Sequence, residues 1–268
     1  MNSLFYGMSR TRLHLPFACR SPALFDSCFV ARLSRYLELT RTEKQVLAEL
    51  ERHPQNYPAG SVLCREGEDV TELLIVHHGW ALSETQMQSG KRQILRFHFS
   101  GDLIGASGIA FKDSPSSIKA ATDMVVCRFP RRALGETFSE HPRLAALLFS
   151  ISQMESIDLS DRLRALGRSE GKERLANLFL SIAARMRAVN GEHNPVVRMP
   201  LTQTDLGDAV GLTQVHVNRL IRQMTEEKLI TRTRSTVTLL DEPRLVEMAR
   251  FIDRFGAIDS SWFPPTKD

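Results

Sequence analysis

The sequence predicts an α+β protein with a β-rich N-terminal half, a long central helix and a small helical module near the C-terminus. Between residues 57 and 130, short runs rich in β-branched and aromatic residues alternate with glycine, aspartate and proline. From residue 143 to residue 166, apolar residues recur every three or four positions, which is the helical period. Residues 201–224 show two shorter helical patterns on either side of a glycine. A chain of 268 residues is long enough for two modest domains, each with its own core.

The N-terminal half begins with residues 1–28, which show no sustained periodicity and are expected to form a partly disordered extension. Two short helical patterns follow, at residues 29–37 and 42–52. The runs expected to form strands are residues 61–65, 72–78, 80–86, 91–99, 117–122 and 124–129.

Alternation within these runs indicates how the strands pack. In the fourth run, Leu95, Phe97 and Phe99 share one face, opposite Arg96 and His98. Such period-two patterning, with turns roughly every 8–12 residues, indicates an antiparallel barrel or sandwich.

The central helix is expected to be ~35 Å long at the usual rise per residue. Its apolar stripe consists of Leu144, Leu147, Leu148, Ile151, Met154 and Ile157. The stripe suits packing on the chain's own barrel and equally suits a coiled coil with a second copy, so it leaves both open. Further helices are expected at residues 172–187 and 242–255, and a hairpin at 231–240.

The segment 201–224 carries the functional prediction, because its spacing is that of a helix-turn-helix. Thr202 and Asp205 form a capping-box pattern that starts the first helix. Gly211 follows that helix, where a sharp turn requires a residue that tolerates positive φ. Thr213 can cap the second helix.

The second of these helices presents side chains that suit the major groove of DNA. Gln and Asn can form paired hydrogen bonds with adenine, Arg can do so with guanine, and Val can touch the thymine methyl. The following hairpin adds basic residues that suit phosphates. The residues expected to contact DNA are Thr202, Thr213, Gln214, Val215, His216, Asn218, Arg219, Arg222, Arg232 and Arg234. The alternative is a plain helical hairpin with a solvated polar face.

Charge supports an anionic partner for this module. Residues 168–240 carry 11 Lys and Arg against 7 Asp and Glu, which accounts for the whole net charge of +4. No apolar run approaches ~18 residues, so no membrane span is expected. Residues 1–28 contain arginines but no apolar core or cleavage site, so no signal peptide is expected. With 4 cysteines, a disulfide scaffold is not expected, and we predict a reducing, cytoplasmic location.

The motif LTQTDLGDAVGLTQVHVNRLI, the long helix before it and the segment RQILRFHFSGDLIG together resemble the Crp/Fnr family of bacterial transcription regulators, in particular its oxygen- and nitrogen-oxide-responsive, Fnr/FixK-like branch. The resemblance covers about residues 29–240. It implies a cyclic-nucleotide-binding-like β-roll at 29–136, a dimerisation helix at 137–168, a winged helix-turn-helix at 169–243 and a C-terminal helix and tail at 244–268.

The resemblance also implies partners and base-reading residues. It implies a homodimer on a near-palindromic duplex site with half-sites one turn apart, and RNA polymerase as a further partner. Gln214, Val215, Asn218 and Arg219 would be the base readers. Many members have Glu where Val215 stands and Gly or Ser where Asn218 stands, so we expect a different target sequence.

An effector pocket is expected around Gly101, Asp102, Gly105, Ser116 and Ser117. In members that bind cyclic nucleotides, a Glu follows the GD-x-x-G turn and an Arg-Ser pair comes later. Here the corresponding positions hold Ala106 and a Pro-Ser-Ser run, so cyclic AMP is not the expected effector. Lys112 or Lys119 are the alternative cations for a phosphate.

Oxygen-sensing members hold an iron–sulfur cluster with four thiolates, which makes Cys19, Cys28 and Cys127 the candidates here. Cys64 lies in an expected strand and not at a ligand position, so the cluster is one thiolate short and no cofactor is predicted. Cys127 as a buried core thiol is the alternative.

No metal site and no enzyme are expected. His77 and His78 adjoin on one strand without a second pair at ligand spacing. No catalytic set is assembled either. The alternative function is a redox or small-molecule sensor whose β-roll holds an iron–sulfur cluster or an unknown ligand.

Overall fold

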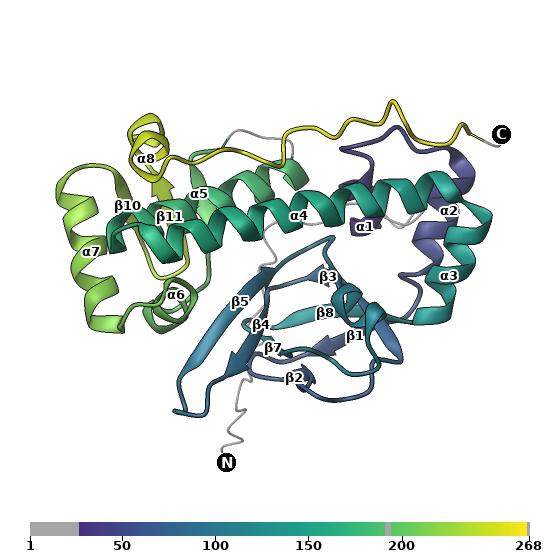
Figure 1. The fold of residues 1–268 in the computed structure, drawn as a ribbon, viewed down its shortest axis with the longest axis horizontal. Coiled ribbons are helices and arrows are strands. Elements are labelled where there is room, and N and C mark those ends of the chain that lie inside the picture. Colours follow the sequence, from purple (N-terminus) through teal and green to yellow (C-terminus); the bar gives the residue numbers. More distant parts are fainter. Residues whose placement is uncertain (1–26, 191–193, 267–268) are drawn as a thin grey trace, which may run out of the picture.

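The computed structural model describes residues 27–190 and 194–266. The expected extension at 1–28 therefore lies outside the described residues, apart from its last two positions. A long helix, α4 (Pro142–Arg168), spans the molecule, with a β-roll beneath it (Figure 1). Three short helices gather at one end of α4, and the helical C-terminal module lies at the other.

The helices at the first end are α1 (Cys28–Leu33), α2 (Arg41–Glu49) and α3 (Arg131–Glu140). The two expected helical patterns correspond to α1 and α2, whereas α3 was not expected. Thr40 caps α2 through a capping box with Glu43, which fixes where the helix begins. Phe29 and Leu47 pack with residues of α4 in one buried cluster, so this end of α4 is held by apolar contact.

The β-roll consists of two four-stranded antiparallel sheets, ordered β1-β8-β3-β6 and β2-β7-β4-β5. The strands are β1 (Pro54–Tyr57), β2 (Val62–Cys64), β3 (Glu72–His78), β4 (Ala81–Gln86), β5 (Arg92–His98), β6 (Leu103–Ile104), β7 (Ser117–Ala120) and β8 (Met124–Pro130). A 3-10 helix, η1 (Ala106–Ala110), follows β6. All six expected strands are present, and β1 and β6 are additional.

A bulge in β5 places the Leu95 side chain on a different face from the one that the sequence predicts. Ser83 pairs with Arg96 and the next residue of β4 pairs with Ile94, so Leu95 is the extra residue. Leu95 is 40% exposed, whereas His98 is buried. The expectation that Leu95 shares the face of the two phenylalanines, opposite His98, is therefore wrong.

The two halves of α4 differ in what they contact. Its first half buries Leu144, Leu147, Ile151 and Met154 against the chain's own core. Its second half leaves large apolar side chains exposed, namely Ile157, Leu159 and Leu163. The first half of α4 therefore packs on the chain's own core. The exposed second half leaves the coiled coil with a second copy as the open alternative.

The C-terminal module contains α5 (Gly171–Asn190), α6 (Gln203–Val210), α7 (Gln214–Glu226) and α8 (Glu242–Ala249). A small sheet of β9 (Val196–Arg198), β10 (Ile230–Arg232) and β11 (Thr236–Leu239) accompanies them in the order β10-β11-β9. The helix α8 ends at Arg250, whose φ of 48° is left-handed, and so is shorter than expected. After α8, the chain runs back along α4 (Figure 1).

One buried cluster joins the C-terminal module to the β-roll. It contains Trp80, Phe97 and Phe99 of the roll together with Phe179 of α5 and Val217 of α7. The molecule is therefore not divided into two separate cores. Among the described residues, no helix is long and apolar enough to cross a membrane.

Candidate nucleic-acid interface

Local hydrogen bonds define the turn between α6 and α7. The Thr202 hydroxyl accepts from the Asp205 amide at 3.0 Å, and the Asp205 carboxylate accepts from the Thr202 amide at 2.9 Å, as the sequence predicts. Gly211 ends α6 with a φ of 68°. A Cβ on Gly207 would lie 2.5 Å from the Leu212 carbonyl oxygen, so the close approach of the two helices requires this glycine as well.

The helix α7 separates a buried face from an exposed one. Its buried residues are Val217, Leu220, Ile221 and Met224. The exposed residues include Gln214, Val215, Asn218, Arg219 and Arg222, and His216 is half-buried. Val215 is 80% exposed, the largest exposed fraction among the large apolar side chains of the described residues.

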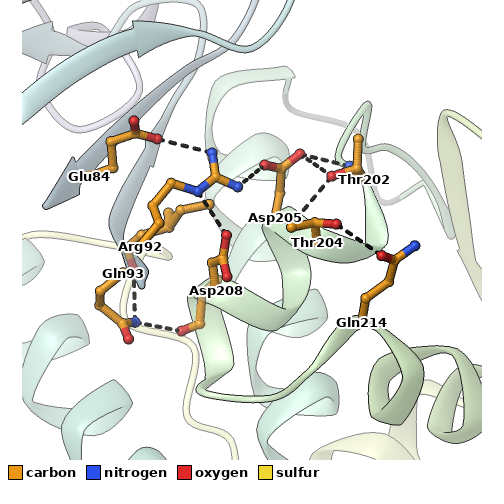
Figure 2. A network of polar contacts seen from close by, with 10 residues as sticks. Glu84, Arg92, Gln93, Thr202, Thr204, Asp205, Asp208 and Gln214 are labelled. Atoms are coloured by element: carbon orange, nitrogen blue, oxygen red, sulfur yellow. Dashed lines mark hydrogen bonds and ion pairs between the residues drawn. The ribbon is translucent and has the colours of Figure 1, made fainter. Parts of the chain in front are cut away.

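Few contacts within the chain occupy these exposed side chains. Arg222 pairs with Glu226 at 2.8 Å, and Gln214 accepts a 3.4 Å hydrogen bond from Thr204 (Figure 2). Asn218 and Arg219 form no hydrogen bond or ion pair with another described residue. They are therefore available to a partner. Thr213 caps α7 by accepting from the His216 amide at 3.3 Å, and the first-turn amides of the helix face outward for an anion.

The hairpin after α7 presents its two expected arginines differently. Arg234 is exposed in the turn between β10 and β11. Arg232 is half-buried and donates to the Leu201 carbonyl oxygen at 2.6 Å, at the start of α6. Two further exposed cations were not anticipated: Arg198 on β9, and Lys228, whose positive φ closes the turn after α7. The only sequence feature that pointed toward these two cations was the net positive charge of residues 168–240.

A cavity of about 530 Å³ lies between β5, the turn after β6, α4 and α5. Of the expected effector residues, Gly105 and Ser116 line it, whereas Gly101, Asp102 and Ser117 do not. The guanidinium groups of Arg96, Arg162 and Arg185 reach it from three different elements, which local sequence patterns cannot show. Lys112 instead pairs with Asp69 at 3.6 Å on the surface.

Asp102 has a structural role. Its carboxylate accepts from Arg185 at 2.9 Å and from the Phe99 amide at 2.9 Å, and it also pairs with Arg32. All three charged side chains are buried. Burial lowers the pKa of Arg32 to about 10. This group joins α1, the β-roll and α5.

The cysteines do not fit a four-thiolate cluster. Cys28 donates to the His77 carbonyl oxygen and Cys127 to the Glu51 carbonyl oxygen, both at 3.3 Å, so these two approach one corner of the roll. Cys64 lies on β2, in the other sheet. Cys19 lies outside the described residues. Because the chain has 4 cysteines, at most three can gather there.

A winged helix-turn-helix, joined through a long helix to a β-roll, defines this protein as a DNA-binding transcription regulator. Residues 54–141 match the family model of the cyclic nucleotide-binding domain, and residues 173–248 match that of the Crp-like helix-turn-helix domain. The chain belongs to the Crp/Fnr family, in its Fnr/FixK-like branch.

Proteins with similar sequences are named as transcription regulators. The chain is 26% identical over 222 residues to the transcriptional activator protein Anr of Pseudomonas protegens, covering 83% of this chain and 91% of that protein. It is 24% identical over 224 residues to the fumarate and nitrate reduction regulatory protein of Vibrio cholerae, covering 84% and 89%. The fold is similar to that of FixK2 from Bradyrhizobium japonicum, with a TM-score of 0.66, 23% identity, and coverage of 73% of this chain and 96% of that one.

Proposed function

We propose that the protein binds a near-palindromic duplex site as a homodimer, with each α7 in the major groove and the half-sites one helical turn apart. The exposed face of α7 is the observation that carries this proposal. Asn218 and Arg219 have no partner among the described residues, and Val215 is exposed beside them. An unpaired Arg and Asn on a helix surface are the side chains that recognise base edges.

Each side chain on this face suits a particular base. Arg219 can form a paired hydrogen bond with guanine, and Asn218 or Gln214 with adenine. Val215 offers a methyl surface to thymine, which a carboxylate at that position would not. Arg234 and Arg222, together with the capped N-terminus at Thr213, suit phosphates, which position the helix without reading sequence.

The second half of α4 supports the dimer. Leu159 and Leu163 are exposed on one side of the helix, and Ser152 and Ser156 continue that side toward its N-terminus at steps of three or four residues. This is the spacing of a coiled-coil seam. A two-fold pair of α4 helices would set the two α7 helices as a symmetric pair, which matches a palindromic site.

Further partners follow from the family resemblance. We assign RNA polymerase as the partner through which the bound dimer regulates transcription, and the cytoplasm as its location, where a bacterial genome is accessible. The cavity bordered by Gly105 and Ser116 is the candidate site for a small effector other than cyclic AMP. The proposal assigns no catalytic step to the chain.

Replacement of Arg219 tests the proposal. We expect Arg219→Ala to lose roughly 1–3 kcal/mol of specific binding free energy and to relax the base preference at one position of each half-site. Selection of bound genomic fragments with the unmodified protein defines the site. Fluorescence anisotropy then compares that site with single-base variants for both proteins.

The matched control is Arg52→Ala, which removes the same charge from an exposed residue remote from α7, paired only with Glu49. We expect unchanged affinity and base preference. A uniform loss across all sequences for Arg219→Ala would make this residue a phosphate contact. No retention of any genomic fragment at low salt would refute DNA binding by this face.

A further inference from the structure

Three side chains with metal-binding atoms converge where α1, α2 and the sheet β1-β8-β3-β6 meet, and a cysteine lies beside them. Atoms of Glu51, His77 and Cys127, each able to ligate a metal, all lie within 4.8 Å of one another. The thiol of Cys28 donates to the His77 carbonyl oxygen and so lies at the same corner. Glu51 follows α2, His77 lies near the end of β3 and Cys127 lies within β8, so no sequence motif could have indicated the group.

Two polar atoms at this corner have no hydrogen bond within the described part of the chain. Oε1 of Glu51 and Nδ1 of His77 are both buried and form no hydrogen bond with another described residue. They lie 3.7 Å apart, which is within ion-pair distance when His77 is protonated but beyond hydrogen-bond distance. The side chain of Glu51 is only 4% exposed. Buried polar atoms without partners are costly, and a missing ligand is one explanation for them.

The supporting structure orients these ligands. The other carboxylate oxygen of Glu51 accepts from the Ser27 hydroxyl and, at 3.4 Å, from the Phe29 amide, which leaves Oε1 directed at His77. His77, the last residue but one of β3, is the extra residue of a β-bulge between Val76 and His78, and such bulges commonly redirect a side chain toward a site. Hydrogen bonds that hold ligands from behind are typical of metal centres.

We propose that Glu51, His77 and Cys127 bind one borderline divalent cation of the Zn²⁺ type. Thiolate, imidazole and carboxylate are the ligands that Zn²⁺ takes in proteins, in tetrahedral sets. Binding replaces the proton of the Cys127 thiol and the Nδ1 proton of the His77 imidazolium with the metal, and both protons go to solvent. One thiolate and one carboxylate neutralise the two positive charges, so the ion can be buried at low cost.

The site differs from an iron–sulfur cluster in its donors. At most three thiols can gather here, and a carboxylate and an imidazole occupy the remaining directions. His77 is half-buried, with 38% of its side chain exposed, which gives a route of entry from solvent. The inference is independent of the proposed DNA binding, because none of these residues lies in the C-terminal module.

Cobalt(II) is a suitable probe because its thiolate complexes absorb visibly and its tetrahedral sites are intensely coloured. The full chain is stripped with a chelator, titrated anaerobically with Co²⁺ and then with Zn²⁺. We expect one Co²⁺ per chain, a thiolate-to-cobalt charge-transfer band, and displacement by Zn²⁺. Cys127→Ser should abolish that band or reduce it strongly, and His77→Ala should weaken Co²⁺ binding at least about 100-fold.

Two matched variants control for fold and for adventitious binding. His78→Ala removes the adjacent, more exposed histidine, and Cys64→Ser removes a thiol on the other sheet. Both should bind Co²⁺ as the unmodified chain does, and circular dichroism confirms that every variant is folded.

Three results would overturn the proposal: no charge-transfer band with the unmodified chain, a band unchanged in Cys127→Ser, or the same loss in His78→Ala as in His77→Ala. A further experiment, anaerobic incubation with iron and sulfide, distinguishes a single metal ion from an iron–sulfur cluster. A sulfide-containing chromophore that depends on Cys127 would assign the corner to a cluster. Gel shifts of the metal-free chain report separately on DNA binding.

Discussion

His98 is a neutral histidine enclosed by cations. Its Nε2 lies 2.7 Å from the Ser83 hydroxyl, and its side chain is buried. Burial, followed by the charges of Arg96, Arg185 and Arg32, lowers its pKa well below 6.5. In the folded protein this imidazole therefore stays unprotonated at pH values where a free histidine is charged.

This difference predicts a pH dependence of stability. As pH falls below about 6.5, the unfolded chain binds a proton at this histidine and the folded chain does not, so the free energy of unfolding decreases. The decrease is at most about 1.4 kcal/mol per pH unit for one group. Urea unfolding from about pH 7 to about pH 5.5 should show it, with a shallower slope for His98→Gln. Parallel slopes for the two proteins would contradict the assignment.

The strand that carries His98 shows a limit of sequence reasoning. Alternation within residues 91–99 placed Leu95 on the face of Phe97 and Phe99, but Leu95 is the extra residue of a bulge and is exposed. A bulge is set by pairing with a neighbouring strand, here at Ser83, and the strand's own sequence does not reveal it.

At the scale of elements, the hairpin β4–β5 binds α6, the first helix of the helix-turn-helix, through ion pairs. Arg92 donates to Asp205 at 2.6 Å and to Asp208 at 2.7 Å on α6, and to Glu84 at 3.1 Å (Figure 2). Arg162 of α4 adds hydrogen bonds to the Ala209 carbonyl oxygen at 2.8 Å. These contacts fix α6, and through the turn α7, against the β-roll.

We expect Arg92→Ala to loosen this contact without unfolding the roll. The loss of three charge-assisted hydrogen bonds should cost about 1–3 kcal/mol, because the two aspartates then return to water. Hydrogen exchange should quicken at the amides of α6 and of the β4–β5 turn. Arg65→Ala, which removes an exposed arginine paired only with Glu68, is the control. Equal exchange in both variants would show that the Arg92 contacts do not hold α6.

The elements that the sequence predicted well are those with local signals. Caps at Thr202 and Thr213 and the left-handed Gly211 specify α6 and α7 within a few residues. The strands β1, β6 and β9 have two to four residues and too little pattern to detect. The exposed side of α7 could be predicted for the same local reason. The convergence of Glu51, His77 and Cys127 could not, because it depends on tertiary contacts between distant elements.

At the scale of the whole molecule, α4 has two functions along its length. Its first half belongs to the core of the N-terminal end, and its second half exposes Leu159 and Leu163, which are 49% and 61% exposed. The segment after α8 returns along α4 (Figure 1) and places Trp262 edge-on against Phe149, with ring centroids 6.4 Å apart. Trp262 thus contacts α4 near its start, although Phe149 remains 58% exposed.

The exposed leucines in the second half of α4 predict where a dimer can be broken. In a two-fold interface each copy contributes its own Leu163, so both leucines are lost together in Leu163→Glu. Burial of a leucine stabilises by about 1.5–3 kcal/mol, so the variant should dissociate at concentrations where the unmodified protein is dimeric in sedimentation velocity. Met87→Glu, at an exposed residue in the turn after β4, should remain dimeric. A Leu163→Glu protein that sediments as the unmodified one would place the interface elsewhere. If it becomes monomeric yet binds a single half-site weakly, α4 determines assembly and α7 determines recognition.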